Sequence, residues 1–212
     1  MSKRLLIVRH AERPQIADGE VGNDLCLTEA GVQATRYFAS TLDQEVVSIQ
    51  SSPILRCMQT AQLIADIHGY ARENIKTSRL LGDPGFFIAD ADLAWQSWLN
   101  RGSEAVNAHL LSGSETWPGF RNFDEAVADM LNRIRAELST PGQGLVVWVT
   151  HDTILATFTS RLLTSPLSMD EWPDFLGTLD ISLLHDGQIE LIYAGSRHLS
   201  RFETLNSADF VL

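Results

Sequence analysis

The chain has 212 residues, of which 44% are hydrophobic and 20% charged. This is the composition of an ordinary soluble globular protein that is long enough to bury a substantial core. The formal net charge of −11 argues against nucleic acid or an anionic membrane as a general partner, because both select basic surfaces. It does not exclude a phosphorylated substrate, since a small cationic pocket can lie within an acidic protein.

The cysteines and the N-terminus favour a cytoplasmic protein. The two cysteines, Cys26 and Cys57, form no metal-binding cluster with histidines, so we expect free thiols, no metal and no cofactor. The N-terminal apolar run stops at Arg9 and is therefore too short for a secretory signal or a membrane span.

The first half of the chain predicts alternating strands and helices. A continuous apolar run at residues 5–8 is typical of a strand buried on both faces of a parallel sheet. Thr28 can cap a helix that reaches about Leu42, and Ser52 with Pro53 can start a second helix that ends at Gly69. The other strands predicted here cover residues 46–50 and, more weakly, 74–78.

The second half begins with an irregular segment at about residues 82–120, rich in Gly, Pro and Trp. We interpret it as an insertion with some helix that packs over the sheet edge and could form a wall for substrate. The remaining pattern predicts helices at 123–138 and 153–163, and strands at 145–149, 179–185 and 188–194. The last two strands flank Asp186-Gly187, a strong hairpin signal.

This alternation predicts one α/β domain over residues 1–212. We expect a three-layer sandwich with a mostly parallel sheet, one antiparallel strand, and helices on both faces.

Polar residues directly follow two of the buried strands. Arg9-His10 follows the first apolar run, and Thr150-His151-Asp152 follows residues 145–149. Ligands in open α/β sheets bind at the carboxyl ends of the strands, so we expect both histidines at one edge. Arg56, in the first turn of a predicted helix, should point toward the same edge. Each residue alone has an ordinary structural explanation; their co-location indicates a site.

These residue types suit phosphoryl transfer. Arginine matches phosphate oxygens with a planar fork, a neutral imidazole is a good nucleophile, and a carboxylic acid can protonate a leaving oxygen. Cys57 lacks the surrounding loop of a cysteine phosphatase and is read as a buried small residue.

The segments LLIVRHAERP, SSPILRCMQTA and VTHD resemble the signature of the histidine phosphatase superfamily, and LTEAGVQA resembles its first helix. The resemblance implies that His10 is the phosphorylated nucleophile and that Arg9, Arg56 and His151 hold the transferring phosphoryl group. Arg13 would add a phosphate contact, as the similar motif of the acid-phosphatase branch does. Glu12 could orient Arg13 or touch substrate.

The proton donor and the reaction stay open between alternatives. The acid-phosphatase pattern points to Asp152, whereas the mutase and small-phosphatase pattern points to a carboxylate after the third strand, here Asp83. We expect hydrolysis of a small phosphomonoester or of phosphohistidine on a protein. The alternatives are a phosphomutase, which needs a longer closing region, and an inactive module that binds phosphate esters. The sequence does not indicate the oligomeric state.

Overall fold

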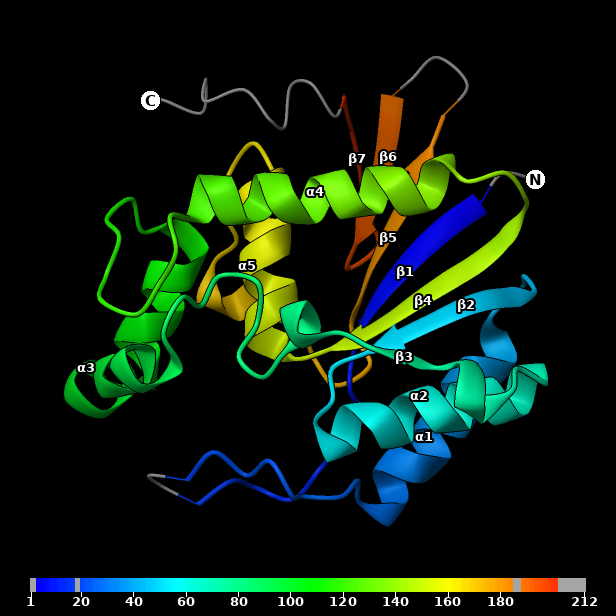
Figure 1. The fold of residues 1–212 in the computed structure, drawn as a ribbon, viewed down its shortest axis with the longest axis horizontal. Helices are drawn as coiled ribbons and strands as arrows, with labels where there is room; N and C mark the ends of the chain where they lie inside the picture. The colour runs from blue at the N-terminus through cyan, green and yellow to red at the C-terminus, as the bar shows by residue number, and fades with distance from the viewer. Residues whose placement is uncertain (1–2, 18–19, 185–187, 202–212) are drawn as a thin grey trace.

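The computed structural model describes residues 3–17, 20–184 and 188–201, and shows a single twisted sheet flanked by helices (Figure 1). In the described residues the sheet has seven strands in the order β3-β2-β4-β1-β5-β6-β7. The strands are β1 (Lys3–Arg9), β2 (Val46–Ser51), β3 (Lys76–Thr77), β4 (Gly144–Thr150), β5 (Thr178–Leu183), β6 (Gln188–Tyr193) and β7 (Ser196–Arg201). The helices are α1 (Glu29–Thr41), α2 (Leu55–His68), α3 (Ala91–Ser112), α4 (Phe123–Ser139) and α5 (Asp152–Leu162).

The sheet confirms the expected α/β class with mostly parallel strands. Strands β1 to β4 pair in parallel, whereas β5 pairs antiparallel with β1 and β6, and β7 antiparallel with β6. Two described strands, β5 and β7, therefore run against the others, one more than expected. The predicted Asp186-Gly187 turn lies outside the described residues.

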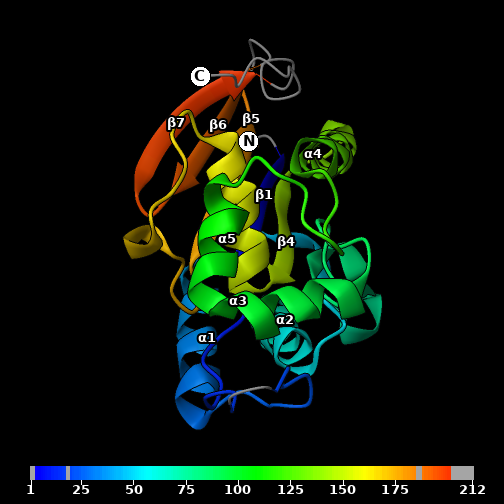
Figure 2. The same cartoon turned by 90° about the vertical axis from the view of Figure 1, so that its left-hand side faces the viewer.

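The three-layer arrangement follows from the alternation of side chains along the two central strands. Leu5 and Ile7 of β1 face a core shared with α3, α4 and α5, while Leu6 and Val8 face a core shared with α1 and α2. All seven residues of β4 are buried, as expected for a strand covered on both faces. Figures 1 and 2 show the two helical layers from perpendicular directions.

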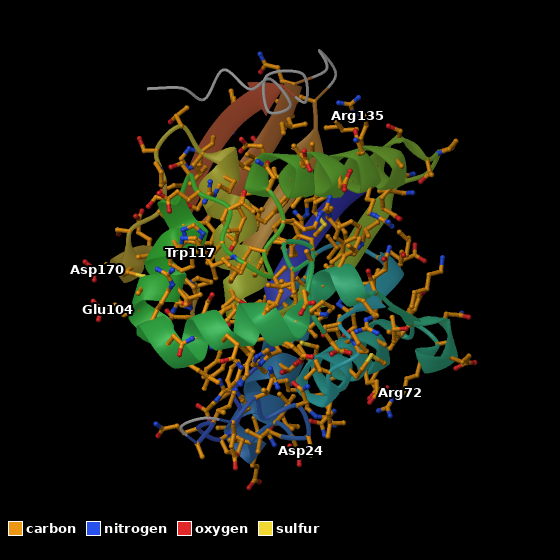
Figure 3. The ribbon with its side chains drawn as sticks, turned by 60° about the vertical axis from the view of Figure 1, so that its left-hand side comes forward. Asp24, Arg72, Glu104, Trp117, Arg135 and Asp170 are labelled. Atoms are coloured by element: carbon orange, nitrogen blue, oxygen red, sulfur yellow. The ribbon has the colours of Figure 1, made fainter. Side chains whose placement is uncertain are left out.

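The segment at 82–120 differs from the expectation. It contains the long helix α3, interrupted at Gly102, whose φ of 79° is a left-handed conformation that suits glycine. This helix packs mainly on α5 rather than over the sheet edge. Trp117, labelled in Figure 3, stacks on His109 with ring centroids 3.6 Å apart, so it belongs to the packing of this layer. In the parts of the chain described here, no helix has both the length and the apolar character needed to cross a membrane.

Candidate active site

The parallel pairing of β1 and β4 brings the two histidines together. Arg9 at the end of β1 lies opposite Thr150 at the end of β4, and the His10 backbone N–H donates to the Thr150 carbonyl oxygen at 2.8 Å. The His10 and His151 rings then meet edge to face, with centroids 5.4 Å apart. The sequence expectation that both strands deliver a histidine to one sheet edge is confirmed.

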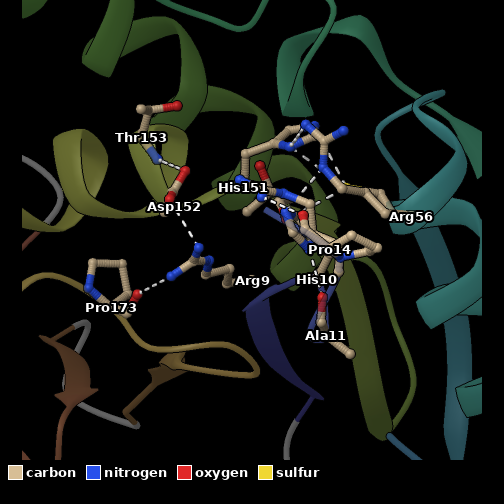
Figure 4. Close-up of polar contacts among 12 residues, drawn as sticks. Arg9, His10, Ala11, Pro14, Arg56, His151, Asp152, Thr153 and Pro173 are labelled. Carbon is tan, nitrogen blue, oxygen red and sulfur yellow. Dashed lines mark hydrogen bonds and ion pairs between the residues drawn. The ribbon is translucent and has the colours of Figure 1, made fainter. Parts of the chain in front are cut away.

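Arg56, in the first turn of α2, joins the two imidazoles (Figure 4). Its Nε donates to His10 Nε2 at 3.0 Å, and its Nη2 lies 3.2 Å from His151 Nδ1. Its Nη1 donates to the Gly22 carbonyl oxygen at 2.7 Å. The guanidinium is therefore fixed by three contacts, two of them to the site and one to the loop before α1.

The hydrogen bonds define the tautomer of His10. Its Nδ1 lies 2.7 Å from the Ala11 carbonyl oxygen, which can only accept, so Nδ1 carries the proton. Its Nε2 accepts from Arg56 and therefore presents a lone pair. The pKa of His10 is lowered from 6.5 to about 3, mainly by burial and further by the positive charges of Arg56 and Arg9. The hydrogen bond to the Ala11 carbonyl opposes this shift but does not cancel it. The ring is thus neutral, with its lone pair on Nε2.

His151 is held from the opposite side by Ser52. Because Arg56 can only donate to His151 Nδ1, the proton of this ring lies on Nε2, 2.9 Å from Ser52 Oγ. Burial and the Arg56 charge lower the pKa of His151 well below its ordinary value. The predicted helix cap at Ser52 is wrong: α2 begins at Leu55, and Ser52 Oγ serves His151 as well as the Ile54 backbone N–H.

Gly82 closes the site behind His151. A Cβ placed at Gly82 would come within 2.4 Å of the His151 ring and 2.7 Å of Ser52 Oγ. Its φ of 140° is also unfavourable for other residues. The segment after β3 is thus held against the imidazole, and glycine is required there by both space and backbone.

Asp152 and Arg9 form the ionic side of the site. The Asp152 carboxylate lies 3.0 Å from Arg9 Nη2, while its other oxygen accepts from the Thr153 N–H. Burial alone would raise the pKa of Asp152, but the Arg9 charge, the Thr153 N–H and the two imidazoles outweigh it and lower the pKa. Asp152 is therefore a carboxylate in this state of the protein.

The loop before β5 fixes the other end of Arg9. The Pro173 carbonyl oxygen accepts from Arg9 Nη1 at 2.7 Å, and the guanidinium carbon lies 4.2 Å from the centre of the Phe175 ring. Phe175 also lies beside the His10 ring, 5.8 Å between centroids. No local pattern indicates that this loop takes part in the site, since the contact joins positions 164 residues apart.

The three remaining candidates lie differently. Arg13 is near Arg9 and Arg56, since its charge lowers the pKa of both; its buried Nε has no hydrogen-bond partner among the described residues. Glu12 instead accepts from the Thr28 hydroxyl at 2.6 Å, at the start of α1. The carboxylate of Asp83 lies on the exposed side, 3.9 Å from Arg79.

Cys57 does not act as a nucleophile in this arrangement. Its side chain is fully buried beside the Thr150 carbonyl, and burial raises the pKa of the thiol to about 12. The protonated thiol agrees with the interpretation of Cys57 as a small packing residue. In the described parts of the chain no group of three or more potential ligands is placed to hold a metal ion.

The order and geometry of these segments agree with the family comparison. A sequence model of the histidine phosphatase superfamily (branch 1) matches residues 5–188. The chain belongs to this superfamily. The resemblance seen in the sequence motifs is thereby confirmed, and the match extends beyond them through β5.

Solved structures of this histidine phosphatase fold are similar over the whole chain. A phosphoserine phosphatase variant from Entamoeba histolytica, in complex with phosphoserine, aligns with a TM-score of 0.58 and 19% identity over 99% of this chain and 100% of that chain. A mycobacterial glucosyl-3-phosphoglycerate phosphatase with inorganic phosphate aligns with a TM-score of 0.57 and 19% identity over 100% of both chains. At these identities the likeness establishes the shared fold. A search among curated proteins finds no match.

Proposed function

We propose that this histidine phosphatase hydrolyses phosphomonoesters, or phosphohistidine on a protein, through a phosphohistidine formed on His10. The observation that carries the proposal is the lone pair of a neutral His10 Nε2, which accepts from Arg56 and lies near the guanidinium groups of Arg9 and Arg13. Catalysis of phosphoryl transfer consists mainly of alignment and charge stabilisation, which this cluster supplies.

The first step is an in-line attack of His10 Nε2 on phosphorus. Substrate binding raises the pKa of Asp152, which takes up a proton from solvent. The N–P bond then forms as the bond from phosphorus to the leaving oxygen breaks, and that oxygen takes the proton from Asp152. Arg56 releases Nε2 and transfers its N–H donors to the phosphoryl oxygens, alongside Arg9, Arg13 and His151. Water then attacks the phosphohistidine, with Asp152 accepting its proton, and phosphate leaves.

Several features favour an enzyme that needs no metal and works in the cytoplasm. The guanidinium groups supply the positive charge that a divalent ion supplies in other phosphatases. Cys26 and Cys57 are free thiols, as suits a reducing compartment. The substrate is a small phosphorylated molecule or a phosphoprotein. Asp83 remains the alternative proton donor, because it follows Gly82, which touches His151.

The test is a trapping experiment with His10→Ala and a matched control, His68→Ala, whose ring contacts the Ala39 carbonyl away from the site. A phosphate-labelled aryl ester is mixed with enzyme and quenched in denaturant. We expect a base-stable, acid-labile label on the wild type and the control, and neither label nor turnover with His10→Ala. Turnover that survives His10→Ala overturns the assignment. In a second assay with a phosphate ester that carries a further hydroxyl group, recovery of an isomerised ester instead of free phosphate would favour the mutase.

A further inference from the structure

The imidazole of His151 is held so that its Nδ1 faces the same place as the nucleophilic nitrogen of His10. Arg56 bridges the two rings: its Nη2 lies 3.2 Å from His151 Nδ1 and its Nε lies 3.0 Å from His10 Nε2 (Figure 4). In the proposed mechanism Arg56 releases His10 Nε2 to the phosphoryl group. A phosphoryl group at that position therefore also meets His151 Nδ1.

The other nitrogen of His151 has its acceptor in the protein interior. Ser52 is fully buried, and its Oγ lies 2.9 Å from His151 Nε2. Ser52 Oγ also accepts from the Ile54 backbone N–H at 3.3 Å, which fixes the oxygen in place. Turning the ring over would place carbon atoms against Arg56 and Ser52, and Gly82 packs against the ring edge. The orientation of the ring is therefore fixed, with the proton of the free protein on Nε2.

This arrangement conflicts with a neutral His151 as a phosphoryl ligand. The oxygens of a phosphoryl dianion can only accept hydrogen bonds, and Nδ1 of the neutral ring presents a lone pair, so the two groups repel. Moving the proton from Nε2 to Nδ1 would give up the bond to Ser52 in the interior. A second proton on Nδ1 removes the conflict, while Ser52 keeps its bond to Nε2.

The charges around the ring explain why this second proton arrives with phosphate. The titratable and charged side chains that face His151 are Arg9 and His10 at the end of β1, Arg56 and Cys57 on α2, and Asp152 on α5. Burial and the positive charges lower the pKa of the free ring, whereas Asp152 opposes this shift. A phosphoryl dianion pairs with the guanidinium groups and places negative charge against Nδ1, which favours the imidazolium.

We propose that Ser52 is a positioning residue that keeps a proton on His151 Nε2, so that His151 holds the phosphoryl group as an imidazolium. The second proton, on Nδ1, is taken up from solvent as phosphate binds and returns to solvent when phosphate leaves. No bond to phosphorus changes in this step. The inference rests on the proposed function, because it needs a phosphoryl group between His10 and His151.

The ring nitrogens of His151 report their protons directly in ¹⁵N NMR, because protonated and unprotonated imidazole nitrogens have well separated chemical shifts. The full chain is labelled at its six histidines, and His151→Gln identifies the His151 signals by their loss. In the free protein we expect a proton on Nε2 and a lone pair on Nδ1. With saturating inorganic phosphate at neutral pH we expect protons on both. Asp152 also takes up a proton then, but it has no ring nitrogen and leaves the assignment unaffected.

The variant Ser52→Ala removes the acceptor of His151 Nε2. Its matched control is Ser51→Ala, because Ser51 is equally buried but its hydroxyl donates to the Ser52 carbonyl oxygen at 2.8 Å. With phosphate, His151 in Ser52→Ala should carry a single proton, on Nδ1, and phosphate should bind about tenfold or more weakly. Ser51→Ala should match the wild type in both measurements.

A single proton on His151 in the phosphate-bound wild type would overturn the proposal, whether or not Ser52→Ala folds. Two protons in phosphate-bound Ser52→Ala, or equal losses of affinity in the two serine variants, would also overturn it. These outcomes leave the proposed function standing, because trapping of the label on His10 tests that separately. If phosphate shifts neither the His10 nor the His151 signals, no phosphoryl group lies between the rings and the proposal falls; the trapped label then shows whether the proposed function survives.

Discussion

Replacing His10 by Gln should remove a large part of the acid sensitivity of the fold. His10 is 2% exposed, and in the folded protein its pKa is lowered from 6.5 to about 3 by burial and by Arg56 and Arg9. Below pH 6.5 the unfolded chain therefore binds a proton at this residue that the folded chain does not. The unfolding free energy contributed by His10 is fully present above its unfolded pKa and falls as the pH drops toward its folded pKa.

The size of the effect follows from the pKa difference. The slope approaches about 1.4 kcal/mol per pH unit, and between pH 7.5 and 5.0 a single such histidine accounts for about 2 kcal/mol. This is a substantial fraction of the 5–15 kcal/mol or so by which domains are stable. His151 shifts in the same direction and remains in the variant, so part of the acid sensitivity should persist.

The measurement is urea unfolding of the wild type and His10→Gln between pH 7.5 and 5.0 at constant ionic strength. The difference in unfolding free energy between the two proteins should change by about 2 kcal/mol over this range. Ile7→Val, in β1 beside the site, is the control: it should cost about 0.5–1.5 kcal/mol at every pH. Parallel pH curves for wild type and His10→Gln would refute the reasoning, since they would mean that His10 takes up its proton equally in both states.

The other predictions concern turnover. Asp152→Asn should reduce turnover of alkyl phosphates by about 10²–10⁴-fold but that of nitrophenyl phosphate far less, because only the alkoxide leaving group needs a proton. Equal losses for both substrates would assign the proton donor to another residue, and Asp83→Asn would be the next variant to assay. Arg56→Lys should keep the charge but lower kcat/KM by at least about tenfold, because an ammonium cannot reproduce the paired contacts to both imidazoles; unchanged kinetics would place Arg56 outside the reaction. Dialysis against EDTA should leave turnover unchanged, and a loss restored by a divalent ion would show that a metal takes part.

The central part of the fold could be predicted because its signals are local. The apolar runs of β1 and β4 are bounded by Arg9-His10 and His151-Asp152, so the strands and the polar residues at their ends are visible in the same few residues. Because β1 and β4 are parallel neighbours, the histidines that follow them lie at the same edge of the sheet, and no other signal is needed to predict this. The placement of Arg56 followed in the same way from the start of α2.

The parts that could not be predicted depend on contacts between distant segments, or on turns and helices whose sequences lack the usual signals. Pro173 and Phe175 contact Arg9 across a separation of 164 residues or more, and nothing in their local sequence indicates it. Strand β7 was missed because its turn uses Ala194-Gly195, both with positive φ, where Asn-Gly or Asp-Gly would have been recognised. Gly102 interrupted the helical pattern of α3.

Because Asp152 is ionised, it can donate a proton in the proposed reaction only after substrate binding raises its pKa. Arg9 lies 3.0 Å from the Asp152 carboxylate and lowers its pKa, so this group has no proton to donate. A phosphoryl dianion competes for the same guanidinium and places negative charge beside Asp152, and both effects raise the carboxyl pKa. In the proposed mechanism, Asp152 therefore takes up its proton from solvent when substrate binds. Pro173 and Phe175 contact the same guanidinium, and the proposed mechanism needs these contacts to hold Arg9 in the site while phosphate replaces the carboxylate as its partner.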